Sequence, residues 1–239
     1  MKQILFLIGI VLSVSCSKAT HTGTIPSHNS SSTSVIDLSP TLQSQILGGE
    51  QHFAVYLPPS YATEPNKRYP VLYLLHGMNQ NYKSWINEGA LQAVADEVIA
   101  EGAKEMIIIC PDGFNSFYYN RPQMRYEDFF IQEFIPEIER RYRILSEKSH
   151  RNIAGLSMGG FGATYLAFQY HNLFGNAYST SGGFIEPAMS LLKGIVNSKL
   201  PTQKNFFPSY TLECGEEDSL VIESNRVFSQ FLDEKQINY

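Results

Sequence analysis

Gly155-Leu156-Ser157-Met158-Gly159 stands between the short run Arg151-Asn152-Ile153-Ala154 and a helix-like stretch at 160–170. A G-x-S-x-G pattern between a strand and a helix is typical of a nucleophile elbow, a sharp turn that lifts a serine hydroxyl above a sheet. Small flanking residues let two backbone segments pass closely and let the serine adopt a strained conformation. The setting favours a nucleophilic Ser157, and a purely structural glycine-rich turn is the alternative.

Strands and helices alternate on both sides of this motif. Continuous apolar runs predict buried strands at 71–75 and 106–110, and period-two alternation predicts an antiparallel strand at 51–57. Two further strands are expected at 176–181 and 210–214. Helical spacing of apolar residues predicts helices over 86–100, 127–142, 160–170, 185–196 and 219–235, with Pro136 kinking or delaying the second.

This alternation predicts an α/β fold with a mostly parallel sheet covered by helices on both faces. In such sheets the active groups gather at the carboxyl ends of the strands. The loops that begin at His76, Pro111, Leu156 and Gly215 leave from that edge, so we expect one active site there.

Composition limits the possible functions. The 239 residues are 43% hydrophobic and 13% aromatic, which suits one well-filled domain. A net charge of −5 gives no support to nucleic-acid binding. The histidines and cysteines lack metal-ligand spacing, so we expect no metal and no cofactor.

The N-terminus is typical of an export signal. A positive start is followed by an apolar run at 4–14 that is too short for a permanent membrane span. Leu12-Ser13-Val14-Ser15-Cys16 resembles a bacterial lipobox, which predicts lipidation of Cys16; ordinary cleavage beside an incidental cysteine is the alternative. We therefore expect a signal peptide over 1–16, a Ser/Thr-rich tether over 17–40 and a folded domain over 41–239. The protein would be exported to the periplasm or cell surface, touching a membrane only through this anchor.

Two cysteines lie within the domain. Cys110 and Cys214 each end a predicted strand, and these strands are not neighbours in the expected sheet. Bridged Cα atoms must lie within about 7 Å. We expect two buried free thiols.

A serine nucleophile needs an oxyanion hole, an orienting acid and a base. The N–H of Met158, which follows the serine, is the first expected oxyanion donor, and that of Met78, in the loop after the strand at 71–75, is the second. Asp218 is the acid candidate because it follows a strand that comes after Ser157. Glu216 and Glu217 compete with it for this role.

Several motifs together resemble the esterase D family, which includes feruloyl and acetylxylan esterases, S-formylglutathione hydrolases, siderophore esterases and mycolyltransferases. They are Leu74-Leu75-His76-Gly77, Trp85, Pro111-Asp112-Gly113 with Asn115-Ser116-Phe117-Tyr118, Ile153 to Gly160, and Cys214-Gly215-Glu216-Glu217-Asp218. The resemblance covers residues 46–239. It implies an α/β-hydrolase fold, a Ser–Asp–His triad with Ser157 and Asp218, and carboxylic-ester hydrolysis through an acyl-enzyme. Phe117 departs from the Trp common in members that act on plant cell walls.

Other side chains near the expected site are candidates for substrate contact. We expect His76, Trp85 and Tyr118 to bind substrate, and Phe114, Phe117 and Tyr119 to extend an acyl or sugar platform. Core or lid packing is the alternative for each aromatic residue. His76 is also expected to hydrogen-bond within the oxyanion loop.

The triad histidine is not found by sequence, because no histidine follows Asp218. His76 is the only other histidine expected near Ser157, and it could substitute as the base. We expect a C-terminally incomplete copy of an esterase, with the last strand, begun at 237–239, and the histidine loop missing. A natural protein that has lost the triad is the alternative.

The resulting functional hypothesis is an exported serine esterase that removes feruloyl or acetyl groups from plant polysaccharides or oligosaccharides. Its partner would be a small-molecule or oligosaccharide ester. The alternatives are a catalytically inactive esterase-like lipoprotein that binds glycans, and a siderophore esterase.

Overall fold

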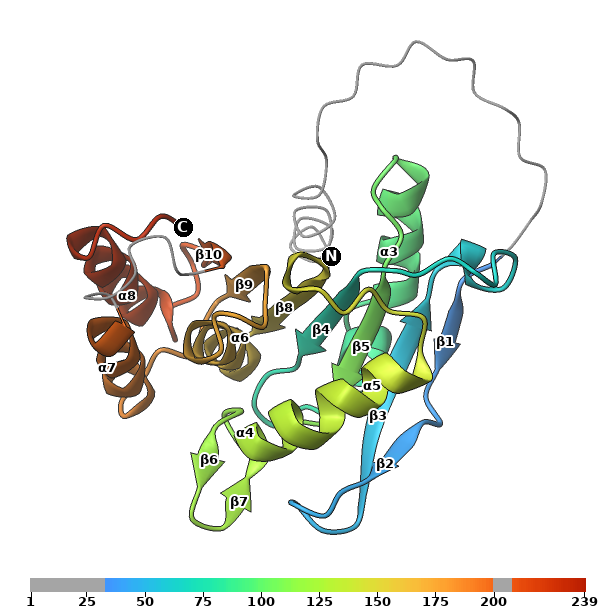
Figure 1. Ribbon diagram of the computed structural model, residues 1–239. Coiled ribbons are helices and arrows are strands. Elements are labelled where there is room, and N and C mark those ends of the chain that lie inside the picture. The colour runs from blue at the N-terminus through green and yellow to red at the C-terminus, as the bar shows by residue number, and fades with distance from the viewer. Residues whose placement is uncertain (1–32, 200–207) are drawn as a thin grey trace.

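A computed structural model describes residues 33–199 and 208–239 (Figure 1). An eight-stranded sheet runs through it in the order β1-β3-β5-β4-β8-β9-β10, with β2 paired to β3. The strands are β1 (Val35–Asp37), β2 (Thr41–Gln43), β3 (Glu50–Leu57), β4 (Val71–Leu75), β5 (Ile107–Pro111), β8 (Arg151–Leu156), β9 (Asn176–Thr180) and β10 (Ser209–Glu213). A separate hairpin joins β6 (Asn120–Arg121) to β7 (Met124–Arg125).

The direction of the strands confirms the predicted α/β architecture. β5, β4, β8, β9 and β10 run parallel to one another, and β3 is antiparallel to β5. Leu75 of β4 lies opposite Gly155 of β8, and Leu156 lies opposite Thr180 of β9. The loops after β4, β8 and β9 therefore leave the sheet at one level, on either side of Ser157.

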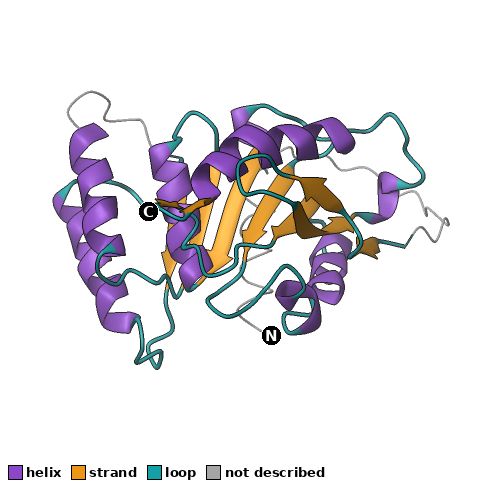
Figure 2. Ribbon diagram, turned by 90° about the horizontal axis from the view of Figure 1, so that it is seen from below, coloured by secondary structure: helices purple, strands orange, loops and turns teal. Residues whose placement is uncertain are grey.

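The helices are α2 (Ser84–Asn87), α3 (Leu91–Ala100), α4 (Tyr126–Phe129), α5 (Ile135–Arg141), α6 (Met158–Gln169), α7 (Ala188–Lys199) and α8 (Ile222–Glu234). Figure 2 shows helices on both faces of the sheet, as predicted. Short 3-10 turns occur at Pro59–Tyr61 and Lys148–His150.

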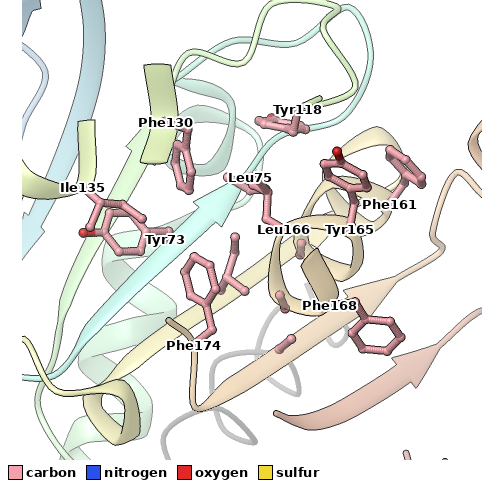
Figure 3. Packing of buried hydrophobic residues seen from close by; sticks show 14 of the residues in the cluster. Tyr73, Leu75, Tyr118, Phe130, Ile135, Phe161, Tyr165, Leu166, Phe168 and Phe174 are labelled. Carbon is pink, nitrogen blue, oxygen red and sulfur yellow. The ribbon is translucent and has the colours of Figure 1, made fainter. Parts of the chain in front are cut away.

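The two faces of β4 explain this layering. Leu72 and Leu74 belong to a core with α3, whereas Tyr73 and Leu75 belong to a core with α5 and α6. Successive side chains of a strand point to opposite faces, so an apolar strand buried on both sides needs a helix layer over each. In the larger core Tyr73 packs edge-on against Phe130 with ring centroids 5.5 Å apart (Figure 3).

Two predicted helices are interrupted. The helix expected over 86–100 is split into α2 and α3, because Ala90 between them has a left-handed backbone, with φ 50°. The helix expected over 127–142 contains a π-helical segment, Phe130–Phe134, before α5. Pro136 has no N–H to donate to the preceding turn, which accounts for the irregular hydrogen bonding at this point.

The expected boundaries need two corrections. Residues 34–40 are not tether, because β1 pairs with β3 and the Ser34 hydroxyl donates to Asp96 at 2.7 Å. Residues 237–239 form no strand. The Ile237 N–H donates to the Leu232 carbonyl, and the Ile237 side chain is buried.

The predicted signal peptide and Cys16 lie outside the described residues. Within residues 33–199 and 208–239, no helix is long and apolar enough to cross a membrane.

The two domain cysteines are both free, as expected. Cys110 on β5 is buried, and burial raises the pKa of its thiol. Cys214, just after β10, is only half-buried, which corrects the expectation of two buried thiols. β4, β8 and β9 separate the two strands, so the sheet order keeps the thiols apart.

A buried carboxylate ties α4 to the helix that follows Ser157. Glu127 of α4 accepts hydrogen bonds from Tyr165 of α6 at 2.8 Å and from Tyr170 just beyond it at 2.7 Å. Burial, and then the neighbouring carboxylate, raise the pKa of both phenols, which therefore remain donors. Glu127 thus holds the C-terminal half of α6 against α4.

Replacing Glu127 with Ala is expected to lower the free energy of unfolding by about 2–4 kcal/mol, because two partly buried hydroxyls lose their acceptor. Urea denaturation followed by circular dichroism measures the change. Glu223→Ala on the exposed face of α8 is the matched control and should change stability by less than about 0.5 kcal/mol. Equal stability of the two variants would contradict a structural role for Glu127.

Candidate active site

Ser157 joins β8 to α6 in a strained backbone conformation. Its φ of 55° and ψ of −115° are unusual for any residue other than glycine. Hydrogen bonds hold it there: its N–H donates to the Thr180 carbonyl at 3.0 Å, and its carbonyl accepts from Gly183 at 2.8 Å and Phe161 at 3.0 Å. Such strain persists only where surrounding structure over-determines it, and it clusters at active sites.

Glycines flanking the serine allow β4, β8 and α6 to meet. A Cβ on Gly155 would lie 2.3 Å from the Gly159 carbonyl carbon, and a Cβ on Gly159 would lie 2.3 Å from the Leu75 carbonyl oxygen. Any side chain at either position would push α6 off the sheet. The backbone contact at these two glycines gives the physical reason for the G-x-S-x-G spacing.

The loop after β4 lies directly beside Ser157. A Cβ on Gly77 would lie 3.6 Å from the Ser157 Cβ. In the described part of the chain no acceptor is assigned to the N–H of Met78 or to that of Met158, the first residue of α6. The Met158 side chain is buried and that of Met78 is 44% exposed, but only their backbone N–H groups matter for the expected oxyanion hole.

Asp218 occupies the turn between β10 and α8. Its carbonyl accepts from the N–H groups of Val221 and Ile222, which fixes the turn. Its side chain is half-buried, whereas Glu216 and Glu217 are exposed. Among residues 33–199 and 208–239, no donor is assigned to the Asp218 carboxylate. Burial favours Asp218 over the two glutamates as the orienting acid.

Comparison with known proteins identifies the family. Residues 44–210 match the family model described as "Putative esterase". The chain belongs to this esterase family. An esterase of Mycobacterium tuberculosis is 34% identical over 148 residues, 59% of this chain and 31% of that protein. An endo-1,4-beta-xylanase/feruloyl esterase of Xylanibacter ruminicola is 33% identical over 156 residues, 62% of this chain and 22% of that protein.

This esterase-family chain spans about a third or less of the length of four curated relatives that it matches. Solved structures match along more of their length. A ferulic acid esterase superposes with a TM-score of 0.77 at 30% identity, over 86% of this chain and 88% of that one. An S-formylglutathione hydrolase of Staphylococcus aureus gives a TM-score of 0.72 at 20% identity, over 91% and 89%. The α/β-hydrolase fold and the predicted family are thus confirmed.

His76 in this esterase fold is buried and fully engaged. The Gly113 N–H donates to its Nε2 at 2.8 Å, and its Nδ1 lies 2.8 Å from the Gly77 carbonyl. Because an amide N–H can only donate and a carbonyl can only accept, the ring is neutral with its proton on Nδ1. The Asp112 carboxylate, 3.6 Å from Nε2, therefore faces an uncharged ring. His76 shapes the oxyanion loop, and neither of its nitrogens is available to serve as a base.

Burial also excludes direct substrate contact by His76, Trp85 and Tyr118, contrary to the sequence-based expectation. Trp85 packs in the core on the α3 side of the sheet. The Tyr118 ring fills the space above Gly113 and Gly162, where a Cβ would lie 2.4 Å from ring atoms, and its hydroxyl donates to the His76 carbonyl. Tyr118 thereby supports the loop after β4 from its buried side. Phe117 and Tyr119 are half-buried against Phe161.

The remaining described histidines lie elsewhere. His52 is within β3 and stacks on Tyr82, while His150 and His171 lie beyond the opposite ends of β8 and α6 from Ser157. No histidine in the described ranges hydrogen-bonds to the Ser157 hydroxyl. In the same part of the chain, no group of three His, Cys, Asp or Glu residues could hold a metal ion.

The sequence did not reveal two residues that connect Ser157 to the turn that carries Asp218. Gly183 donates to the Ser157 carbonyl, and a Cβ there would lie 3.4 Å from the Met158 nitrogen. The Asn225 side chain of α8 donates to the carbonyls of Gly182 and Val221, at 2.8 and 2.9 Å. The Gly182-Gly183 pair after β9 was a usable signal in the sequence. No pattern pointed to Asn225, because its partners are 43 and 4 residues away.

Proposed function

We propose that this chain carries the nucleophile, acid and oxyanion hole of a serine carboxylic-ester hydrolase. The strained, hydrogen-bonded Ser157 beside two N–H groups without acceptors is the observation that carries the proposal. The Ser157 oxygen attacks the ester carbonyl, and the N–H groups of Met78 and Met158 stabilise the oxyanion as the bond forms. Collapse expels the alkoxide, which takes up the proton that the Ser157 hydroxyl has lost and leaves as the alcohol. The acyl group remains on Ser157 until water removes it as the carboxylic acid.

Asp218 is the proposed orienting group for an imidazole. It follows β10, which lies two strands from β8, so about 10 Å separates the two strand ends and leaves room for an imidazole between them. The described residues bring no free imidazole there, and we assign the general-base step to none of them. Acylation by a reactive ester can proceed slowly without a base, but deacylation requires one to activate water.

An acyl-trapping experiment tests this assignment. Incubation with p-nitrophenyl acetate should leave a long-lived acetyl adduct on the peptide that contains Ser157, detected by mass spectrometry. The Ser157→Ala variant should carry no adduct on that peptide. Equal acetylation of the variant and the native chain, on lysines for example, would overturn the proposal.

The proposed substrates are feruloyl or acetyl esters of plant polysaccharides or oligosaccharides. The names of the relatives support this, since a xylanase/feruloyl esterase and a ferulic acid esterase are among them. A second candidate function is ester-bearing glycan binding without turnover. The engagement of both His76 nitrogens favours it. Saccharide binding without any Ser157 adduct would support this candidate over the esterase.

Export and lipid anchoring at Cys16 are also proposed. The lipobox-like sequence at 12–16 after an apolar run supports them. Cells that express the full chain should incorporate labelled palmitate into it, and Cys16→Ser should abolish incorporation. Incorporation that persists in the variant would contradict anchoring at this cysteine.

A further inference from the structure

A cavity of about 340 Å³ opens at the same sheet edge as Ser157, on the side away from Asp218. Its walls come from the β2–β3 turn, the loop after β5 and the β6–β7 hairpin. β3 is antiparallel to β5, with Phe53 opposite Pro111, so the start of β3 lies at the carboxyl end of β5. In Figure 1 the β2–β3 turn and the β6–β7 hairpin both lie at the lower edge of the molecule. The volume is at the small end of the range for small-molecule sites.

Phe114 in the cavity wall is held in an unfavourable conformation while its side chain remains exposed. Its φ is 49° and its side chain is 40% exposed. Phe117 and Tyr118 also have positive φ, but their rings pack against Phe161 and Tyr126. No ring or cation of the described residues is assigned to Phe114. Ring packing therefore accounts for the strain at Phe117 and Tyr118 but not at Phe114, and strain at an exposed side chain points to function.

Hydrogen bonds hold the backbone that carries this ring. The Phe114 N–H donates to the Asp112 carboxylate at 3.0 Å. The side chain of the next residue, Asn115, accepts a hydrogen bond from the Asn79 backbone N–H at 2.8 Å and donates one to the Asn79 side-chain oxygen at 3.0 Å. Asn79 follows Met78, so the wall of the cavity is joined directly to the proposed oxyanion loop.

The opposite wall is also rigid. Glu133 accepts hydrogen bonds from the Ser44 hydroxyl and from the N–H groups of Gln45 and Ile46. The Ser44 N–H donates to the Gly49 carbonyl and closes the turn. Hydrogen bonds thus hold two of the three walls in place, which lowers the entropic cost of binding.

The polar groups of the cavity suit a neutral ligand with hydroxyl groups. Gln51 is only 7% exposed, and its side-chain N–H donates to the Gly48 carbonyl, which orients the amide. Its Oε1 has no donor among the described residues. Arg125 is neutralised by Asp128, 2.6 Å away. An exposed ring beside amides and a neutralised cation fits a sugar, whose C–H face packs on an aromatic ring while its hydroxyls bond to polar groups.

We propose that this cavity is a glycan subsite, which binds a neutral sugar residue of the polysaccharide beyond the one that carries the ester. β5 and β3 lie two and three strands from β8, so the cavity is on the order of 10–15 Å from Ser157. A residue bound there is remote from the ester bond. The inference rests on the proposed polysaccharide substrate but not on turnover by this chain.

Calorimetric titration of the full chain with unsubstituted xylo-oligosaccharides of two to six residues tests the subsite. Affinity should rise with length once the oligosaccharide reaches the cavity. Phe114→Ala should weaken binding of the longest oligosaccharide about tenfold, and Phe114→Tyr should retain it. Val227→Ala is the control, because Val227 is equally exposed, at 39%, but lies on α8.

The outcomes separate this proposal from the esterase proposal. Absence of binding, affinity independent of length, or unchanged affinity of Phe114→Ala would each overturn the subsite, whether or not Ser157 forms an acyl adduct. Competition between methyl ferulate and the longest oligosaccharide for binding to the native chain would also overturn the subsite if Phe114→Ala removed that competition. The cavity would then hold the acyl group and not a sugar. Thermal unfolding checks that Phe114→Ala is folded, and the exposed ring predicts an unchanged midpoint.

Discussion

The 239-residue polypeptide is expected to hydrolyse methyl ferulate at close to the background rate, and added imidazole is expected to restore a rate that depends on Ser157. Both nitrogens of His76 are occupied, and no described histidine reaches the serine. Removing the base of a serine triad costs on the order of 10⁴–10⁶ in kcat. Free imidazole can diffuse to the space beside Asp218 and recover part of that loss, on the order of 10–100-fold.

Chromatographic release of ferulate over a series of imidazole concentrations measures this effect. The matched control is Ser157→Ala, which should show only the slow imidazole-catalysed reaction of free solution. A Ser157-dependent rate near that of ordinary esterases without imidazole, lost in His76→Asn, would show that His76 does act as a base. A saturating imidazole response that Asp218→Asn weakens would support Asp218 as the orienting acid. A response that Glu217→Gln weakens while Asp218→Asn leaves it unchanged would argue for Glu217 instead.

Replacing Gly159 with Ala is expected to lower the free energy of unfolding by about 3 kcal/mol or more. The added Cβ would meet the carbonyl oxygens of Leu75 and His76 at 2.3 and 2.8 Å. Both atoms belong to backbone that cannot swing away, so α6 must move off β4. The midpoint of thermal unfolding should fall by roughly 6–12 °C for a chain of this size.

Gly194→Ala provides the control for that substitution. Gly194 lies within α7 and has no atom within 4 Å of its added Cβ, so alanine should leave stability unchanged or raise it by up to about 1 kcal/mol. Similar losses in both variants would refute the close approach of α6 to β4. Because the same shift would displace the Met158 N–H, Gly159→Ala should also lower formation of the Ser157 adduct under conditions where the protein is folded.

The fold could be predicted because its signals are local. The elbow at Ser157 combines a short motif with a change from strand to helix periodicity, and the apolar run at 71–75 is long enough to require cover on both faces. The interruptions of the helices were predictable only in part. Pro136 marked the second interruption, since α5 begins only at Ile135, whereas Ala90 carries no sequence mark of a left-handed conformation.

The site residues also differ in how far their position could be predicted from the sequence. Asp218 could be placed from its order in the chain, whereas Trp85 and Tyr118 could not be distinguished from exposed aromatic residues. What buries Tyr118 is the space above Gly113 and Gly162, two positions 49 residues apart that only the folded chain brings together (162 − 113 = 49). The occupied state of His76 likewise depends on a distant donor, the N–H of Gly113.

The place of β8 in the sheet has a consequence for dynamics. It is the middle one of five parallel strands, with β5 and β4 on one side and β9 and β10 on the other. Amide hydrogens exchange with solvent slowest where opening requires global unfolding, and the centre of a sheet is such a place. The amides of residues 152–156 should therefore exchange last, after those of the β6–β7 hairpin. The strained backbone at Ser157 directly follows β8, the strand that opens least. This backbone therefore cannot relax without unfolding of the domain.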